Sequence, residues 1–117
     1  MKVILALAAL LAIAPVPARS QVLGGRPAGC PHAFCACGAA LEVLGRNVRA
    51  LWSARAWYKF PRSAPSYNAV AVRPHHVFVL KQHLRGSLWL VKDYNSGGHL
   101  TRLHARSIVG YTIVRAQ

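Results

Sequence analysis

The chain has 117 residues, of which 15 are Lys or Arg and only two are acidic, so its formal net charge at pH 7 is +13. Because Glu42 and Asp93 are the only carboxylate side chains, the composition nearly excludes glycosidases that work with paired carboxylates, and it argues against hard-cation sites built on acidic residues. The positive charge favours polyanionic partners such as anionic lipid, cell-wall polymers or nucleic acid.

Residues 1–20 have the pattern of a signal peptide. Lys2 supplies a positive start, an apolar run follows, and small residues at Ala18 and Ser20 suit cleavage near Ser20. We expect a secreted or periplasmic, monomeric, single-domain protein with no transmembrane anchor after cleavage. In that location an anionic cell-wall polymer is a more accessible partner than nucleic acid, and disulfides are permitted.

The first half of the mature chain predicts an irregular lead-in followed by helices. Residues 21–33 are rich in Gly and Pro, and the domain proper is expected to cover residues 34–117. From Cys37 the apolar residues recur at helical spacing until Gly45, which ends the predicted helix. A second helix is predicted over residues 47–57, with its N-cap at the first of these.

The second half predicts strands, because the hydrophobic period changes from about four to about two. Turns are expected at Tyr67-Asn68, at Arg85-Gly86 and over residues 95–99. Helices followed by hairpin-linked strands predict an α+β fold with a small antiparallel sheet. The strands are predicted at residues 69–72, 76–81, 87–93 and 107–114.

Three cysteines cannot all pair within one chain, so one is left over. Helical phase favours Cys37 as the residue that faces the sheet, because the same phase taken from Cys35 would bury the charge of Glu42. Cys30 and Cys35 are then free to form a short-loop disulfide. A zinc site made by the three thiols and a histidine is the rival interpretation, but the spacing lacks a C-x-x-C knuckle, so we predict no metal and no cofactor.

A cysteine in the first turn of a helix can act as a nucleophile when a histidine takes its proton and a third polar residue orients the imidazole. His75 and His76 are candidates for the base, and their side chains point to opposite faces of a strand, so at most one can meet the thiol. Asp93 and Asn95, at the end of the following strand, are candidates for the orienting residue.

The segments "CGAALEVLG", "APSYNAVAVRPHHVFVL", "LVKDYNSGGH" and "IVGYTIV" together resemble a minimal CHAP domain. CHAP domains are papain-like cysteine amidases and endopeptidases, related to NlpC-type hydrolases, that cut peptidoglycan. The resemblance covers roughly residues 34–114. It implies an N-terminal helix packed on an antiparallel sheet, with Cys37 as nucleophile, His76 as base and Asn95 as orienting residue.

The resemblance has departures that leave alternatives open. His75 stands where the family has Gly, and Tyr67-Asn68 replaces a Pro-Gly turn. The aromatic residue that often precedes the family's cysteine precedes Cys35 here, so Cys35 is an alternative nucleophile, and Asp93 is an alternative orienting residue. The implied activity is hydrolysis of amide bonds, in peptidoglycan above all. A catalytically inactive, basic wall-binding or structural module of the same fold is the alternative function.

Overall fold

Six antiparallel strands and three short helices make up residues 20–117, the part of the chain that the computed structural model describes. The predicted signal peptide, apart from Ser20, lies outside the described residues. None of the helices within residues 20–117 has the length and apolar character needed to cross a membrane. In chain order the elements are β1 (Gln21–Gly24), α1 (Cys35–Leu44), the 3-10 helices η2 (Arg49–Leu51) and η3 (Ala54–Lys59), β2 (Val70–Arg73), β3 (His76–Arg85), β4 (Leu88–Asp93), β5 (Thr101–Ser107) and β6 (Thr112–Val114).

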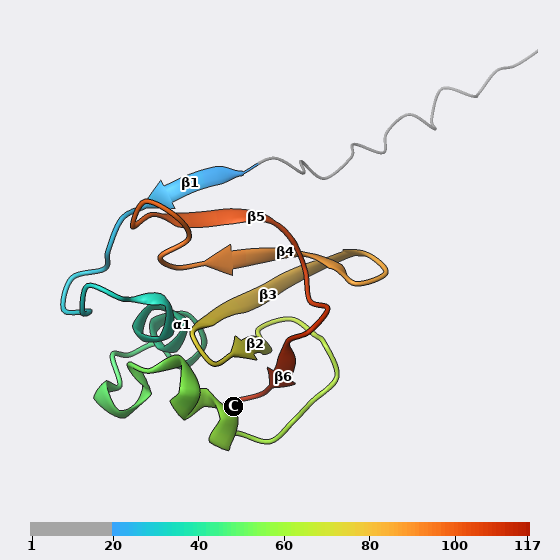
Figure 1. The fold of residues 1–117 in the computed structure, drawn as a ribbon, viewed down its shortest axis with the longest axis horizontal. Coiled ribbons are helices and arrows are strands. Elements are labelled where there is room, and N and C mark those ends of the chain that lie inside the picture. Colours follow the sequence, from blue (N-terminus) through green and yellow to red (C-terminus); the bar gives the residue numbers. More distant parts are fainter. Residues whose placement is uncertain (1–19) are drawn as a thin grey trace, which may run out of the picture.

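The strands form one sheet in the order β1-β5-β4-β3-β2-β6, and every neighbouring pair is antiparallel (Figure 1). Gly86, with a positive φ of 50°, makes the turn between β3 and β4, as the sequence predicted. Asn68 has a φ of 64°, so the turn before β2 uses the left-handed conformation that Asn tolerates. The predicted α+β class with an antiparallel sheet is therefore confirmed.

Helix α1 is built from small and apolar residues, and its end was predicted correctly. Gly45 has a φ of 75°, and its N–H donates to the carbonyl of Leu41, which closes the helix with a left-handed residue. The start differs from the prediction, because the helix begins at Cys35 and its N-cap, Phe34, makes no side-chain capping hydrogen bond. The first turn of α1 therefore keeps its backbone N–H groups uncapped by that side chain.

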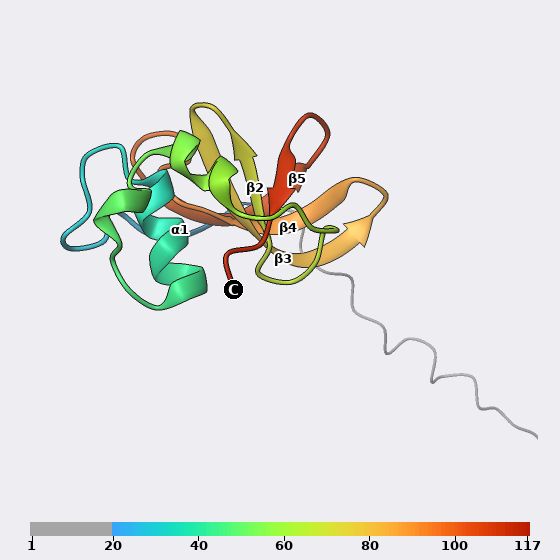
Figure 2. The same ribbon diagram turned by 90° about the horizontal axis from the view of Figure 1, so that it is seen from below.

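The two faces of the sheet are covered differently (Figure 2). Helix α1 and the two 3-10 helices pack on one face of β2 and β3, where alternate valines meet Trp57 and the alanines of α1. The opposite face packs Phe78, Leu80 and Trp89 against the segment that leads into β6. Because strand side chains alternate between faces, neighbouring residues of β3 serve these two separate cores.

Three local predictions were wrong for identifiable reasons. The helix expected over residues 47–57 is replaced by two 3-10 helices, because Asn47 accepts a hydrogen bond from the Trp52 indole at 2.7 Å instead of capping a helix. The strand expected over residues 107–114 is interrupted by a turn at Gly110, whose φ is 86°. The lead-in, expected to be irregular, begins with β1, which pairs with β5, an element that was also not predicted.

One close approach brings the start of α1 against the end of β4. A Cβ placed on Gly38 would overlap the ring of Tyr94, directly after β4. Tyr94 in turn donates a hydrogen bond from its hydroxyl to Glu42 at 3.0 Å, so the same aromatic side chain contacts α1 at two levels. The absence of a side chain at Gly38 therefore sets how closely the first turn of α1 can approach the sheet.

We predict that Gly38→Ala lowers the free energy of unfolding by about 1–3 kcal/mol, because the added methyl group must displace a buried aromatic ring. Urea unfolding followed by tryptophan fluorescence measures the loss. Gly24→Ala is the matched control, since a Cβ there meets no atom within 4 Å, and it should leave stability nearly unchanged. Equal stability of the two variants would contradict the prediction.

Candidate active site

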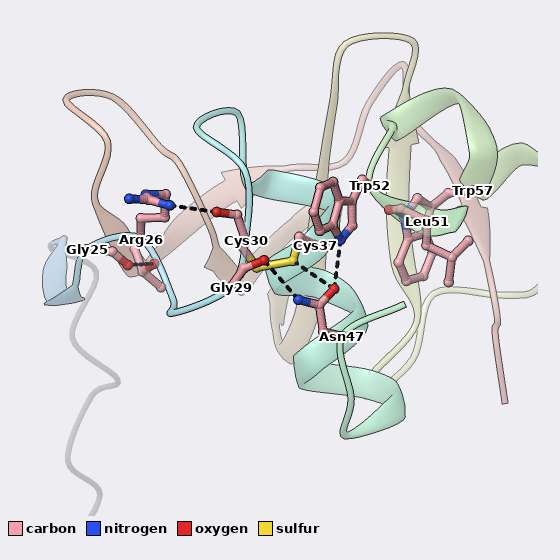
Figure 3. The surroundings of a disulfide bond; sticks show 10 residues. Gly25, Arg26, Gly29, Cys30, Cys37, Asn47, Leu51, Trp52 and Trp57 are labelled. Atoms are coloured by element: carbon pink, nitrogen blue, oxygen red, sulfur yellow. Dashed lines mark hydrogen bonds between the residues drawn. A yellow bond between two sulfur atoms is a disulfide. The ribbon is translucent and has the colours of Figure 1, made fainter. Parts of the chain in front are cut away.

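The cysteine pairing differs from the expected one. The disulfide joins Cys30 to Cys37, with their Cα atoms 5.8 Å apart (Figure 3). Cys35 is the free cysteine. The predicted Cys30–Cys35 bridge is therefore wrong, and Cys37, whose sulfur is bonded, does not supply a free thiol. The same bond rules out a zinc site that uses all three thiols.

The reason lies in how α1 faces its surroundings. Cys35 packs in the core between α1 and strands β2 and β3, whereas Cys37, two residues further round the helix, packs with Cys30 and Phe34 under the lead-in. The prediction assumed that Glu42 could not face the sheet. Glu42 does face it.

Glu42 is accommodated at the sheet because it is paired. Its carboxylate lies 2.7 Å from the Lys81 ammonium and 2.8 Å from that of Lys92. Burial raises the pKa of Glu42, but hydrogen bonds from Lys81, Lys92 and Tyr94 outweigh it and lower the pKa to about 2. The charge that seemed to forbid this helix orientation therefore stabilises it.

Cys35 and His76 meet where the start of α1 approaches the start of β3. Cys35 is the first residue of α1, and only 8% of its surface is exposed. Its sulfur lies close enough to His76, the first residue of β3, to raise the pKa of that histidine. The ring nitrogen Nε2 of His76 is taken by Asp93, so Nδ1 is the nitrogen left for the sulfur. The structure thus brings the alternative nucleophile, not Cys37, to the predicted base.

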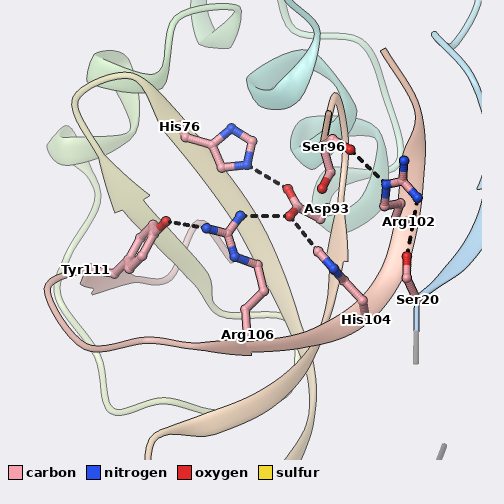
Figure 4. Close-up of polar contacts among 8 residues, drawn as sticks. All are labelled: Ser20, His76, Asp93, Ser96, Arg102, His104, Arg106 and Tyr111. Carbon is pink, nitrogen blue, oxygen red and sulfur yellow. Dashed lines mark hydrogen bonds and ion pairs between the residues drawn. The ribbon is translucent and has the colours of Figure 1, made fainter. Parts of the chain in front are cut away.

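Asp93 is fully buried and accepts three hydrogen bonds from basic side chains (Figure 4). His76 Nε2 lies 2.6 Å from Oδ1, while His104 Nε2 and Arg106 Nη1 lie 2.8 and 2.9 Å from Oδ2. The register of β3, β4 and β5 explains this convergence, because it places all four side chains on the same face of the sheet. Both carboxylate oxygens are engaged, so the carboxylate is held in one orientation.

These contacts shift two pKa values in opposite directions. Burial lowers the pKa of His76, but the hydrogen bond to Asp93, the nearby Cys35 sulfur and the negative charge of Asp93 outweigh it and raise the pKa to about 9. Burial raises the pKa of Asp93, but the hydrogen bond and charge of His76, with the hydrogen bonds of His104 and Arg106, lower it to about 2. At neutral pH the pair is therefore an imidazolium beside a carboxylate.

Asn95, the residue first expected to orient the imidazole, lies elsewhere. It adopts a left-handed conformation with a φ of 57° just beyond β4, and its Oδ1 lies 3.2 Å from Nδ1 of His99. His76 is bonded by Asp93 instead, two residues earlier. The side chain at the end of the strand, rather than the one in the following turn, reaches the ring. His75, the other candidate base, is exposed on the β2–β3 turn.

An open pocket of about 470 Å³ adjoins this cluster. Its walls come from the β2–β3 turn, the loop after β4, and the side chains of Arg106 and Tyr111. His76 and Asn95 both line it, so the base is accessible from the pocket, whereas Cys35 is not among its lining residues. Within residues 20–117 no cluster of three or more His, Cys, Asp or Glu side chains is arranged to hold a metal ion.

Sequence reasoning missed His104 and Arg106, the two further partners of Asp93. Both lie on β5, whose alternation of basic and apolar residues in "TRLHARS" was not recognised as a strand. The signal available in the sequence was the scarcity of acids. With two carboxylates for 15 Lys and Arg, a buried Asp93 had to be shared among several basic groups.

We predict that the His76–Asp93 pair stabilises the fold most between about pH 4 and 6.5. The pKa of His76 is raised from 6.5 to about 9, so its contribution is complete below pH 6.5 and is lost as the pH rises through 9. The pKa of Asp93 is lowered from 3.8 to about 2, so its contribution is lost as the pH falls from 3.8 through 2.

Urea unfolding of the wild type and of His76→Gln across this pH range measures the effect. The difference in unfolding free energy between them should shrink by up to about 3 kcal/mol from pH 6 to pH 10. His83→Gln is the matched control, because His83 is an exposed histidine of the same strand that bonds only the Gly86 carbonyl. A wild-type advantage over His76→Gln that does not vary with pH would refute the assigned pair.

Comparison with known proteins identified no relative of this chain. No protein-family model matches the chain, and comparisons with curated proteins and with solved structures gave no match.

Proposed function

We propose that the chain is an exported cysteine hydrolase that cuts amide bonds, with peptidoglycan as its substrate and a papain-like arrangement of helix and sheet. One observation carries the proposal. The single free thiol within residues 20–117, Cys35, stands at the first residue of α1 near His76, whose Nε2 bonds a buried carboxylate. A nucleophile, a base and a group that orients the base are the three parts that covalent hydrolysis requires.

The proposed nucleophile is the thiolate of Cys35, since the thiolate is the nucleophilic form of cysteine. The imidazolium of His76 places a positive charge beside the sulfur, since the pKa of His76 is raised to about 9. The N–H groups that precede Gly38 in α1 have no acceptor within the helix, because the first helical hydrogen bond runs from the N–H of Gly38 to the carbonyl of Phe34, and they carry the positive end of the helix dipole. Charge and dipole therefore act together.

In the proposed reaction, the Cys35 thiolate attacks the amide carbon and a carbon–sulfur bond forms. The carbonyl oxygen becomes negatively charged and is stabilised by free N–H groups at the start of α1. His76 transfers its proton to the amide nitrogen, the carbon–nitrogen bond breaks, and the amine leaves. Water then attacks the thioester while His76 accepts its proton, and the carbon–sulfur bond breaks, which releases the acid and restores the thiolate beside the imidazolium.

Asp93 holds the reacting ring in place. Its bond to Nε2 leaves Nδ1 as the ring nitrogen that can serve the sulfur, and its negative charge stabilises the imidazolium. His104 and Arg106 occupy the other carboxylate oxygen, so Asp93 cannot swing away from the ring without breaking their hydrogen bonds. Asp93 thus takes the role first given to Asn95.

Peptidoglycan as the substrate is supported by three features together. The resemblance to CHAP domains is to enzymes of the bacterial wall, and the helix-to-sheet arrangement is the one that this resemblance implies. The predicted signal peptide and the disulfide suit an oxidising compartment outside the cytoplasm. The net charge of +13 would hold the protein on an anionic wall polymer in a salt-dependent way.

A non-catalytic wall-binding module of the same fold is the second candidate. The observation that favours it is the burial of Cys35, which exposes 8% of its surface and does not line the pocket beside His76. In that case the +13 charge would carry the function, and the Cys35–His76 contact would be structural. The two candidates differ in whether Cys35 reacts.

Alkylation of the secreted, non-reduced protein by iodoacetamide at pH 6, followed by peptide mapping, tests the reactivity of Cys35. We expect labelling confined to Cys35, with Cys30 and Cys37 recovered as one linked peptide. His76→Gln should slow the labelling about tenfold or more, because the adjacent positive charge is lost, whereas His83→Gln should not. Absent labelling of the folded wild type would favour the binding module.

We predict that Cys35→Ala abolishes the release of free amino groups from purified peptidoglycan, while binding to the polymer is retained. Asp93→Asn should lower kcat by about a hundredfold or more, because the imidazolium loses its carboxylate. Asn95→Ala should change kcat less than about threefold.

Activity should fall as the pH rises through about 9, where His76 loses the proton that the leaving amine needs.

These variants separate the possible outcomes. Full activity of Cys35→Ala would refute the mechanism, and a larger loss for Asn95→Ala than for Asp93→Asn would return the orienting role to Asn95. Circular dichroism and urea unfolding of each variant establish that lost activity is not lost folding.

A further inference from the structure

The pocket beside His76 has a strongly basic wall. Arg73, on the last position of β2, and Arg106, on β5, both line it, with Tyr111 between them. The Arg73 guanidinium stacks on the Tyr111 ring at 4.6 Å from its centroid, and that of Arg106 lies 5.9 Å from the same centroid. Arg106 also donates to the Tyr111 hydroxyl at 3.2 Å. The Tyr111 ring therefore contacts both guanidinium groups and holds them beside one another.

Both arginines keep donors to spare. Arg73 donates only to the backbone carbonyls of Gly110 and Val109, each at 3.4 Å, and no carboxylate within residues 20–117 forms an ion pair with it. Arg106 donates once to Asp93 and once to Tyr111. Since a guanidinium carries about five N–H donors, each arginine has further donors free to bind a ligand.

No carboxylate side chain lines the pocket. The chain has only two acids. Glu42 is held by Lys81 and Lys92 at α1, and Asp93 is fully buried and bonded by His76, His104 and Arg106. A group that enters the pocket from solvent therefore meets a net positive charge, because His76 and Arg106 share the single carboxylate of Asp93 and Arg73 has no ion-pair partner within residues 20–117.

The opposite wall of the pocket is fixed in place. The loop after β4 contributes Asn95, Ser96 and Gly97 to the lining. Ser96 donates its N–H to the Leu100 carbonyl at 2.8 Å, and its own carbonyl accepts from Arg102 Nε at 2.8 Å (Figure 4). A pocket with a held loop on one side and stacked guanidinium groups on the other is preorganised for a ligand.

We infer that this pocket is a carboxylate-binding subsite for the leaving-group side of the substrate, with Arg73 and Arg106 as its anion-binding residues. Its place in the reaction rests on the proposed function, because His76, which gives its proton to the leaving amine, lines the same pocket. The substrate class is then an amide whose amine portion carries a free carboxylate close to the bond that is cut. Arginine suits this task because its planar fork matches a carboxylate.

Binding is tested independently of catalysis by NMR titration of the wild-type protein with N-acetylglycine and, separately, with N-acetylglycinamide. N-acetylglycine should shift the ring signals of His76 and the amide signals of Ser96 and Gly97, and the uncharged amide should bind at least about tenfold more weakly. Arg73→Gln should weaken N-acetylglycine binding about tenfold.

Arg55→Gln is the matched control, because Arg55 is an exposed arginine on η3 and the same charge is removed. Arg73 is chosen over Arg106 because it does not bond Asp93, so the variant should fold. Equal affinity of the acid and the amide, equal affinity of the two variants, or sulfate binding as tightly as N-acetylglycine at the same ionic strength would each overturn the subsite.

Kinetics separate this inference from the proposed function. If the protein is a hydrolase, amide substrates with a free carboxylate on the amine portion should have a kcat/KM at least about tenfold above their carboxamide analogues, and Arg73→Gln should remove that preference. Hydrolysis with no such preference overturns the subsite alone. Carboxylate binding that depends on Arg73, in a protein that hydrolyses no amide, supports the subsite and refutes the enzyme.

Discussion

The buried carboxylate of Asp93 is the interaction on which the centre of this structure depends. A charge with no solvent exposure is tolerated only when its hydrogen-bonding capacity is met, and here three basic side chains from two strands meet it. The cluster fixes the His76 ring and aligns β5 with β4. It also turns Arg106 toward the pocket. One residue thus links the stability of the sheet to the geometry of the site.

The second acid, Glu42, has a corresponding role for the helix. Two lysines from β3 and β4 and the Tyr94 hydroxyl bind it, which fixes the rotation of α1 about its own axis. That rotation decides which cysteine faces His76 and which faces Cys30. In a chain of net charge +13, each carboxylate therefore positions one part of the site. Asp93 positions the proposed base, His76, and Glu42 positions the proposed nucleophile, Cys35.

Much of the fold could be predicted from the sequence where local chemistry decides it. Gly45 and Gly86 marked the end of α1 and the β3–β4 turn, and the apolar alternation in "HVFVLK" marked the core of β3. β5 was not predicted because the alternation in "TRLHARS" places Arg and His, rather than apolar residues, on the face that holds the buried acid. β1 was not predicted because its residues are all exposed and it is held by main-chain pairing with β5.

The site was predicted in part for the same reasons. The position of His76 at the start of a strand follows from local pattern. The choice between Cys35 and Cys37, and between Asp93 and Asn95, depended on tertiary pairing. The rule that a charged residue points away from the core fails at Glu42, because lysines distant in the sequence pair with it. No local sequence pattern reveals those partners.

The cysteine arrangement also constrains how the molecule is made. Cys35 and Cys37 are two residues apart, and in an unstructured chain both thiols are available to Cys30, with no geometric preference between them. Only the turn of α1 carries Cys35 away from Cys30 and leaves Cys37 facing it. Oxidation before helix formation would also join Cys30 to Cys35 and so consume the thiol that faces His76. Formation of α1 therefore directs the correct disulfide pairing.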